Sequence, residues 1–184
     1  LTGANIPFAV RARVCLLRDL GSALAPDNAF TIIQGLETVA LRMKQHCENA
    51  QKVVNFLKTH NEVTKVIYST EHEKIIADRA SKYLKGGNGP MVGIELKGGI
   101  EAGKKFIESL KMFYHVANIG DARSLAIHPA STTHSQLNEK ELAASGVTQS
   151  YVRLCIGIEH IDDIIDDLDQ ALNKSSKTNL KAVG

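Results

Sequence analysis

The chain of 184 residues is 43% hydrophobic and 23% charged, a composition typical of a folded globular protein and not of a disordered or fibrous one. Its 22 Lys and Arg residues against 20 Asp and Glu residues give a formal charge of +2, without the basic stripe of a nucleic-acid binder. No apolar run reaches the roughly 18 residues of a membrane-spanning helix, so no such helix is predicted.

The N-terminal third of the chain is predicted to be helical. From Pro26 to Thr59, apolar residues recur at helical spacing after a mixed N-terminal segment. They indicate one long helix, or two helices with a break near Gly35. We therefore expect an N-terminal segment with a long linking helix over residues 1–60, followed by a separate domain over residues 61–174.

Strands and helices alternate after residue 60. Alternating and β-branched residues predict strands at 63–68, 91–97, 113–117, 124–128 and 151–158. Helical spacing predicts helices at 71–84, 100–110 and 161–172. Asn138 and Glu141 resemble a capping box at the start of another helix. The order predicts an α/β (or α+β) domain with helices on one face of a sheet, and a frayed tail at 175–184.

Arg153 is the side chain whose position is most informative about function. In the strand predicted at 151–158 it lies on the face opposite to Val152 and Leu154, where side chains should be half-buried. A buried guanidinium without a partner is costly, and its planar fork suits a carboxylate or a phosphate. The anionic partner can be an internal Asp or Glu, or the carboxylate of a ligand, and the sequence leaves both open.

The segment from Asn118 to Ser135 is rich in small, hydroxyl and imidazole side chains, which suits either a binding loop or a solvated loop. His128 and His134 are six residues apart without a third ligand at metal spacing, so no metal site is predicted. The three cysteines have neither disulfide-framework nor metal-ligand spacing, which indicates reduced thiols and a cytoplasmic location. They are Cys15, Cys47 and Cys155.

Several ordered motifs carry a family resemblance. They are Gln34-Gly35-Leu36-Glu37-Thr38, Ala117-Asn118-Ile119-Gly120-Asp121, Ile127-His128-Pro129-Ala130-Ser131-Thr132-Thr133-His134, and Arg153-Leu154 with Gly157-Ile158-Glu159. With these motifs, the chain resembles the C-terminal part of the Cys/Met-metabolism family of pyridoxal-phosphate (PLP) enzymes. Within that family it is most similar to the sulfhydrylases that use O-acetylhomoserine.

This resemblance implies a fold and a cofactor. The fold would be the C-terminal small domain of a fold-type I PLP enzyme, a mainly antiparallel sheet with helices on one face, preceded by a long linking helix. In enzymes of this type, PLP forms a Schiff base with a lysine in an S-x-T-K context of a large preceding domain. The present sequence has no such context. We therefore expect PLP to be bound mainly by an upstream domain, and the chain alone to be inactive.

The resemblance also implies roles for two residues. The arginine of the family's R-L-x-x-G-x-E strand pairs with the substrate α-carboxylate, and the matching residue is Arg153. The serine of the family's S-L segment offers its backbone to the same carboxylate, and the matching residue is Ser124. No catalytic residue is expected in this chain, because the Schiff-base lysine is not among its residues.

The implied reaction is a γ-replacement, in which sulfide or methanethiol displaces acetate from O-acetylhomoserine to give homocysteine or methionine. Two alternatives remain open. One is another activity of the same family, such as cystathionine γ-synthase, cystathionine γ-lyase or methionine γ-lyase. The other is a non-catalytic amino-acid-binding α/β module. The expected partner is a small amino-acid substrate, and the whole enzyme is expected to be a homotetramer.

Overall fold

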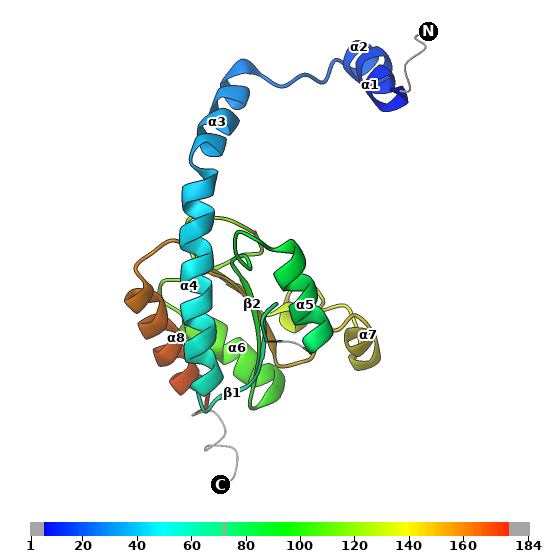
Figure 1. Cartoon of the computed structure of the whole chain (residues 1–184). Helices are drawn as coiled ribbons and strands as arrows, with labels where there is room; N and C mark the ends of the chain where they lie inside the picture. Colours follow the sequence, from blue (N-terminus) through cyan, green and yellow to red (C-terminus); the bar gives the residue numbers. More distant parts are fainter. Residues whose placement is uncertain (1–5, 72, 177–184) are drawn as a thin grey trace. The chain divides into compact units, whose positions relative to one another are not determined.

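The computed structural model describes residues 6–71 and 73–176, which divide into two compact units, one ending at Ala40 and the other beginning at Leu41 (Figure 1). The first unit contains helix α1 (Pro7–Arg11), a π-helical turn (Ala12–Leu17), α2 (Arg18–Leu20) and α3 (Pro26–Glu37). None of the residues in these helices is buried. Residues 1–5 and the expected tail beyond Ser176 lie outside the described part of the chain.

The predicted helical stretch over 26–59 consists of two helices. Pro26 occupies the first turn of α3, where a missing N–H is tolerated, and Thr38 separates α3 from α4 (Val39–Thr59). The break therefore lies three residues after Gly35.

The second unit contains a five-stranded sheet in the order β1-β2-β5-β4-β3. Its strands are β1 (Val63–Ile67), β2 (Met91–Leu96), β3 (Tyr114–His115), β4 (Leu125–Ile127) and β5 (Tyr151–Cys155). All neighbouring pairs are antiparallel except β3 and β4, which are parallel. The expected mainly antiparallel sheet is thus confirmed.

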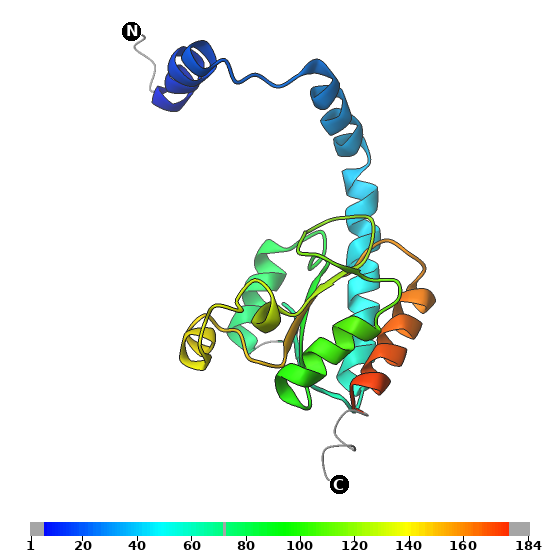
Figure 2. The ribbon, with the colours of Figure 1, turned by 180° about the vertical axis from the view of Figure 1, so that it is seen from behind.

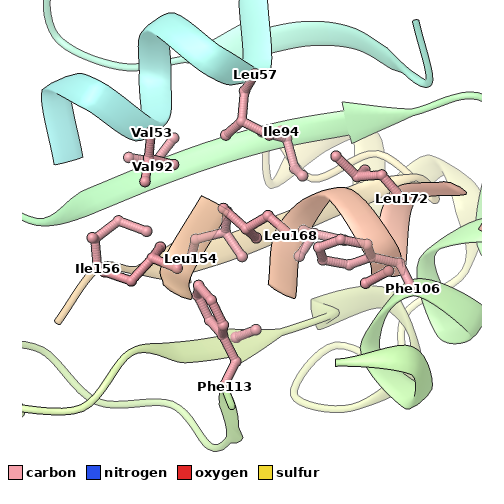
Figure 3. Close-up of a cluster of buried hydrophobic side chains, with 14 of the residues drawn as sticks. Val53, Leu57, Val92, Ile94, Phe106, Phe113, Leu154, Ile156, Leu168 and Leu172 are labelled. Atoms are coloured by element: carbon pink, nitrogen blue, oxygen red, sulfur yellow. The ribbon is translucent and has the colours of Figure 1, made fainter. Parts of the chain in front are cut away.

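Three long helices cover one face of this sheet: α4, α6 (Gly99–Ser109) and α8 (Ile161–Ser176) (Figures 1 and 2). The alternating residues of β2 and β5 point into the core between the sheet and these helices (Figure 3). That core includes Val92, Ile94, Val152, Leu154, Phe106, Leu57, Leu168 and Leu172. Helix α5 (Lys74–Tyr83) lies on the opposite side of the sheet (Figures 1 and 2).

Helix α4 belongs to the core of the second unit for most of its length. Its buried residues are His46, Asn49, Ala50, Val53, Val54 and Leu57. The second unit begins at Leu41 and so includes most of α4, and the expected domain division after residue 60 stays a prediction. Likewise, α8 continues to Ser176 with Ser175 buried, so these two residues of the expected tail are helical.

Two local expectations have different outcomes. The capping box at Asn138 is present at the start of α7 (Glu139–Ala144), where the Asn138 side chain accepts from the Glu141 N–H. Strand β5, in contrast, ends at Cys155 and not at Ile158. The backbone carbonyls of the following residues bond to side chains of α4 instead of continuing a ladder.

Candidate functional site

Arg153 lies in the middle of the sheet, on the face turned away from the core. Its register partners are Gly93 on β2 and Ile127 on β4. Arg153 is half-buried as a residue, and its guanidinium donates from Nη2 to the carbonyl oxygen of Asn118 at 2.9 Å in an exposed hydrogen bond. Among the side chains that the structure describes, no carboxylate lies within 4.0 Å of it. The structure thus places no internal ion pair at Arg153, and its remaining N–H donors are suited to an anionic ligand.

A hollow of about 370 Å³ opens beside Arg153, between the outer face of the sheet and α5. It is lined mainly by apolar and aromatic side chains, among them Ile67, Tyr68, Ile76, Met91 and Tyr151. An apolar hollow with one charged group at its edge has the composition of a site for a small organic anion.

The ring of Tyr151 lies across Gly93, next to Arg153 on the same face. A Cβ atom at position 93 would come within 2.6 Å of Tyr151 Cε2, so only glycine leaves room for the ring. Burial raises the pKa of the Tyr151 phenol, and the positive charge of Arg153 opposes this rise. Because residue 93 is a glycine, the Tyr151 ring can lie against the sheet and line the hollow.

Ser124 is fully buried, and all its polar atoms bond within the chain. Its N–H donates to Glu159 Oε1 at 2.7 Å, and its hydroxyl donates to Glu159 Oε2 at 2.9 Å. Its Oγ accepts from the N–H of Gly157 at 2.8 Å, and its carbonyl accepts from the N–H of Tyr114 at 3.0 Å. The backbone N–H that was expected to meet a substrate carboxylate is thus engaged with Glu159.

Sequence reasoning missed two residues that the structure brings to Arg153 and Ser124. Asn118 contacts the guanidinium of Arg153, and Glu159 accepts from both donors of Ser124. Both belong to motifs that carried the family resemblance. No periodicity signal could have found them, because their partners are 35 residues away in the sequence.

Cys155 and His128 are buried within the fold. Cys155 is buried, which raises the pKa of its thiol against the opposing effect of the Gly120 N–H. His128 is buried between Ser131 and the carbonyl of Gln149. Within the described residues, no group of three or more His, Cys, Asp or Glu side chains could hold a metal ion, and no helix is long and apolar enough to cross a membrane.

Comparison with known protein families matches residues 4–173 to the family described as "Cys/Met metabolism PLP-dependent enzyme". The chain belongs to this family. The mixed α/β fold with its five-stranded sheet agrees with it.

Several individual members of the family are similar to the chain. It is 51% identical over 171 residues to the O-acetyl-L-homoserine sulfhydrylase of Leptospira meyeri, covering 92% of this chain and 39% of that protein. It is 46% identical to O-acetyl-L-homoserine sulfhydrylase 1 of Thermus thermophilus, covering 91% and 40%. It is 41% identical to the L-methionine gamma-lyase of Fusobacterium nucleatum, covering 92% and 43%.

A solved structure is similar over the same region. The crystal structure of an O-acetylhomoserine (thiol)-lyase from Campylobacter jejuni, which contains N'-pyridoxyl-lysine-5'-monophosphate, superposes with a TM-score of 0.83 at 42% identity. The match covers 92% of this chain and 41% of that one. The chain thus spans about 40% of the length of the relatives that it matches.

The hollow beside Arg153 offers no lysine for a Schiff base with PLP. No lysine occurs in an S-x-T-K context in the sequence, and no described lysine lines the hollow beside Arg153. A Schiff base with PLP needs a lysine amine, and this hollow does not provide one.

Proposed function

We propose that the chain recognises the substrate carboxylate in a longer PLP-dependent enzyme that acts on O-acetylhomoserine. Sulfide or methanethiol would form a new C–S bond at the γ-carbon, acetate would leave, and homocysteine or methionine would result. The observation that carries the proposal is the guanidinium of Arg153, which lies beside a hollow with no described carboxylate side chain within 4.0 Å.

The role of Arg153 in this reaction would be to bind and orient. A bidentate guanidinium–carboxylate pair fixes both the position and the rotation of an amino acid, which brings its reacting atoms into a constant orientation. Arg153 would move no proton. PLP, held by residues outside this chain, supplies the electron sink for bond breaking at the amino acid.

Two alternatives are distinguishable by experiment. The similarity to the L-methionine gamma-lyase of Fusobacterium nucleatum favours a second candidate, elimination from methionine, which uses the same carboxylate contact. A non-catalytic binding module would require that the 184-residue chain alone bind an amino acid without PLP. The homotetramer and the cytoplasmic location stay predictions.

The proposal is tested with Arg153→Lys in the full-length protein. A lysine keeps the charge but cannot form the two parallel hydrogen bonds of the guanidinium. We expect the KM for O-acetylhomoserine to rise about tenfold or more, with a smaller change in kcat, since one charge-assisted bond is lost. An unchanged KM would contradict the assignment.

The purified 184-residue chain provides a second test. We expect it to form no homocysteine from O-acetylhomoserine and sulfide, because no S-x-T-K lysine is present. The DNA upstream of the codon for Leu1 provides a third, since an open frame that encodes an S-x-T-K lysine would support the enzyme and an immediate start codon would favour the binding module.

A further inference from the structure

The carboxylate of Glu159 is placed unusually for a charged group. It is half-buried, and among the described residues no lysine, arginine or histidine lies within 4.0 Å of it. Instead, both its oxygens accept hydrogen bonds from one residue, the buried Ser124. A half-buried carboxylate without a cation is costly unless it accepts well-made hydrogen bonds. Because Ser124 supplies these bonds, they stabilise the backbone conformation that presents its N–H and hydroxyl to Glu159.

That conformation belongs to residues 118–124, which we call the Asn118 segment. At its end, Ser124 bonds to Glu159 and to the N–H of Gly157. Two residues earlier, the carbonyl of Ala122 accepts from the N–H of Ile158 at 2.9 Å. At its start, the carbonyl of Asn118 accepts from Arg153.

Helix α4 fixes the other side of Glu159. The Asn49 side chain donates from Nδ2 to the carbonyls of Gly157 (3.1 Å) and Glu159 (2.9 Å). His46 Nδ1 lies 2.6 Å from the carbonyl of Ile156. Both side chains are fully buried, so the backbone that carries Glu159 is anchored to the core.

The space at this junction is fully used. A Cβ atom on Gly157 would collide with Glu159 Oε2, and it would come within 2.5 Å of the Ser124 nitrogen. Glycine at 157 therefore permits the carboxylate to reach Ser124.

We propose that Glu159 is a positioning residue for Arg153. Its carboxylate, through the N–H and hydroxyl of Ser124, holds the Asn118 segment in the conformation in which the Asn118 carbonyl orients the guanidinium toward the ligand carboxylate. Glu159 itself touches no substrate. This inference rests on the proposed role of Arg153 and gives Ser124 an indirect role in place of a direct contact.

The test compares two ligands that differ only in a carboxylate, homoserine and 3-aminopropanol, on the PLP-loaded full-length protein. The measured quantity is the ratio of their Kd values, obtained by calorimetry. In Glu159→Gln, one oxygen remains for the Ser124 N–H, but an amide NH2 replaces the acceptor of the hydroxyl proton. We expect the Kd of homoserine to rise about tenfold, while that of 3-aminopropanol changes less than twofold.

The matched control is Asp167→Asn. Asp167 is a buried carboxylate on α8 that also accepts backbone N–H groups, but on the core side of the sheet. Asp167→Asn should lower the melting temperature and leave the ligand ratio unchanged. A general loss of structure would move both Kd values together, which separates positioning from folding.

Two further variants decide between the possible failures. Ser124→Ala removes the same hydroxyl contact from the other side, and it should shift the ratio in the same direction even if Glu159→Gln does not fold. If Arg153→Lys shifts the ratio but neither Glu159→Gln nor Ser124→Ala does, the positioning role is refuted and the proposed function stands. If Arg153→Lys leaves the ratio unchanged, the proposed function itself is refuted.

Discussion

Two carboxylates of this molecule hold loops by the same chemistry, with different consequences. Asp167 on α8 accepts from the N–H groups of Lys111, Met112 and Phe113 and so fixes the turn between α6 and β3. Glu159 accepts from the N–H and hydroxyl of Ser124. The first turn leads directly into Phe113, whose ring lies in the core (Figure 3). Ser124, which Glu159 holds, is the end of the segment that begins at Asn118, and the Asn118 carbonyl accepts from Arg153.

The effect of each carboxylate depends on the residue at the far end of the segment that its hydrogen bonds hold. Both carboxylates accept from backbone donors, and Asp167 is buried whereas Glu159 is half-buried. Only Glu159 holds a segment that contacts Arg153, a cation with no described carboxylate side chain within 4.0 Å. Variants at the two places should therefore separate stability from ligand binding.

The largest effect on stability is expected for Asp167→Ala. It leaves three backbone N–H groups without their acceptor in a partly buried turn, and it removes one of the acceptors of the Gln170 amide. We expect the free energy of unfolding to fall by about 3 kcal/mol, as measured by urea denaturation of the 184-residue chain. The homoserine to 3-aminopropanol ratio of the full-length variant should be that of the parent protein, and a raised ratio would erase the difference between the two carboxylates.

A somewhat smaller loss of stability is expected for Gly157→Ala. The added methyl group meets the Glu159 carboxylate and the Ser124 backbone, so the junction must open. We expect a loss of about 2 kcal/mol together with a raised ligand ratio. Gly86→Ala is the matched control, since nothing lies within 4 Å of its added Cβ, and it should change neither quantity.

Asn49 bonds to the backbone of Glu159 and Gln170 bonds to Asp167, and we expect only the first to affect ligand binding. Asn49→Ala leaves the carbonyls of Gly157 and Glu159 without a donor, whereas Gln170→Ala removes a donor to Ser109 and Asp167. Each should cost about 1.5 kcal/mol in unfolding experiments. Calorimetry of the full-length variants should show a raised ligand ratio for Asn49→Ala alone, and equal ratios would refute the difference between the two supports.

The smallest expected effect is a change in the pH dependence of stability at His128. Burial lowers the pKa of this imidazole below its ordinary value of 6.5. The unfolded chain therefore binds the proton more readily, and stability that is fully present above pH 6.5 is lost as the pH falls below it. Unfolding of His128→Gln between pH 7.5 and 5 should depend less on pH than that of the parent chain, and an identical slope would contradict the assignment.

His128 also provides a control for the effect of Glu159 on ligand binding. It follows β4, the strand that begins just after Ser124, but its contacts are with Ser131 and Gln149 and not with the Asn118 segment. We expect His128→Gln to leave the ligand ratio unchanged at pH 7.5. A shift would mean that the whole end of β4, and not Glu159 in particular, governs the orientation of Arg153.

Local patterns predicted much of this fold. The alternation in β2 and β5 correctly assigned one face to the core and the other to Arg153, because side-chain direction in a strand depends only on the two-residue period. The capping box at Asn138 was equally local. Periodicity could not show whether the long helix was a linker or part of the core, since an apolar face has the same spacing whatever it packs against.

The amino-acid sequence by itself determined the element order and the family, and it indicated Arg153 as a candidate site residue, because these depend on short patterns and ordered motifs. Only the tertiary structure decided that α4 packs on the sheet, that Asn118 meets Arg153, and that the donors of Ser124 belong to Glu159. These contacts join residues 35 to 110 positions apart. Hydrogen bonds over such separations form only when packing brings their partners together, so no local rule could have assigned them.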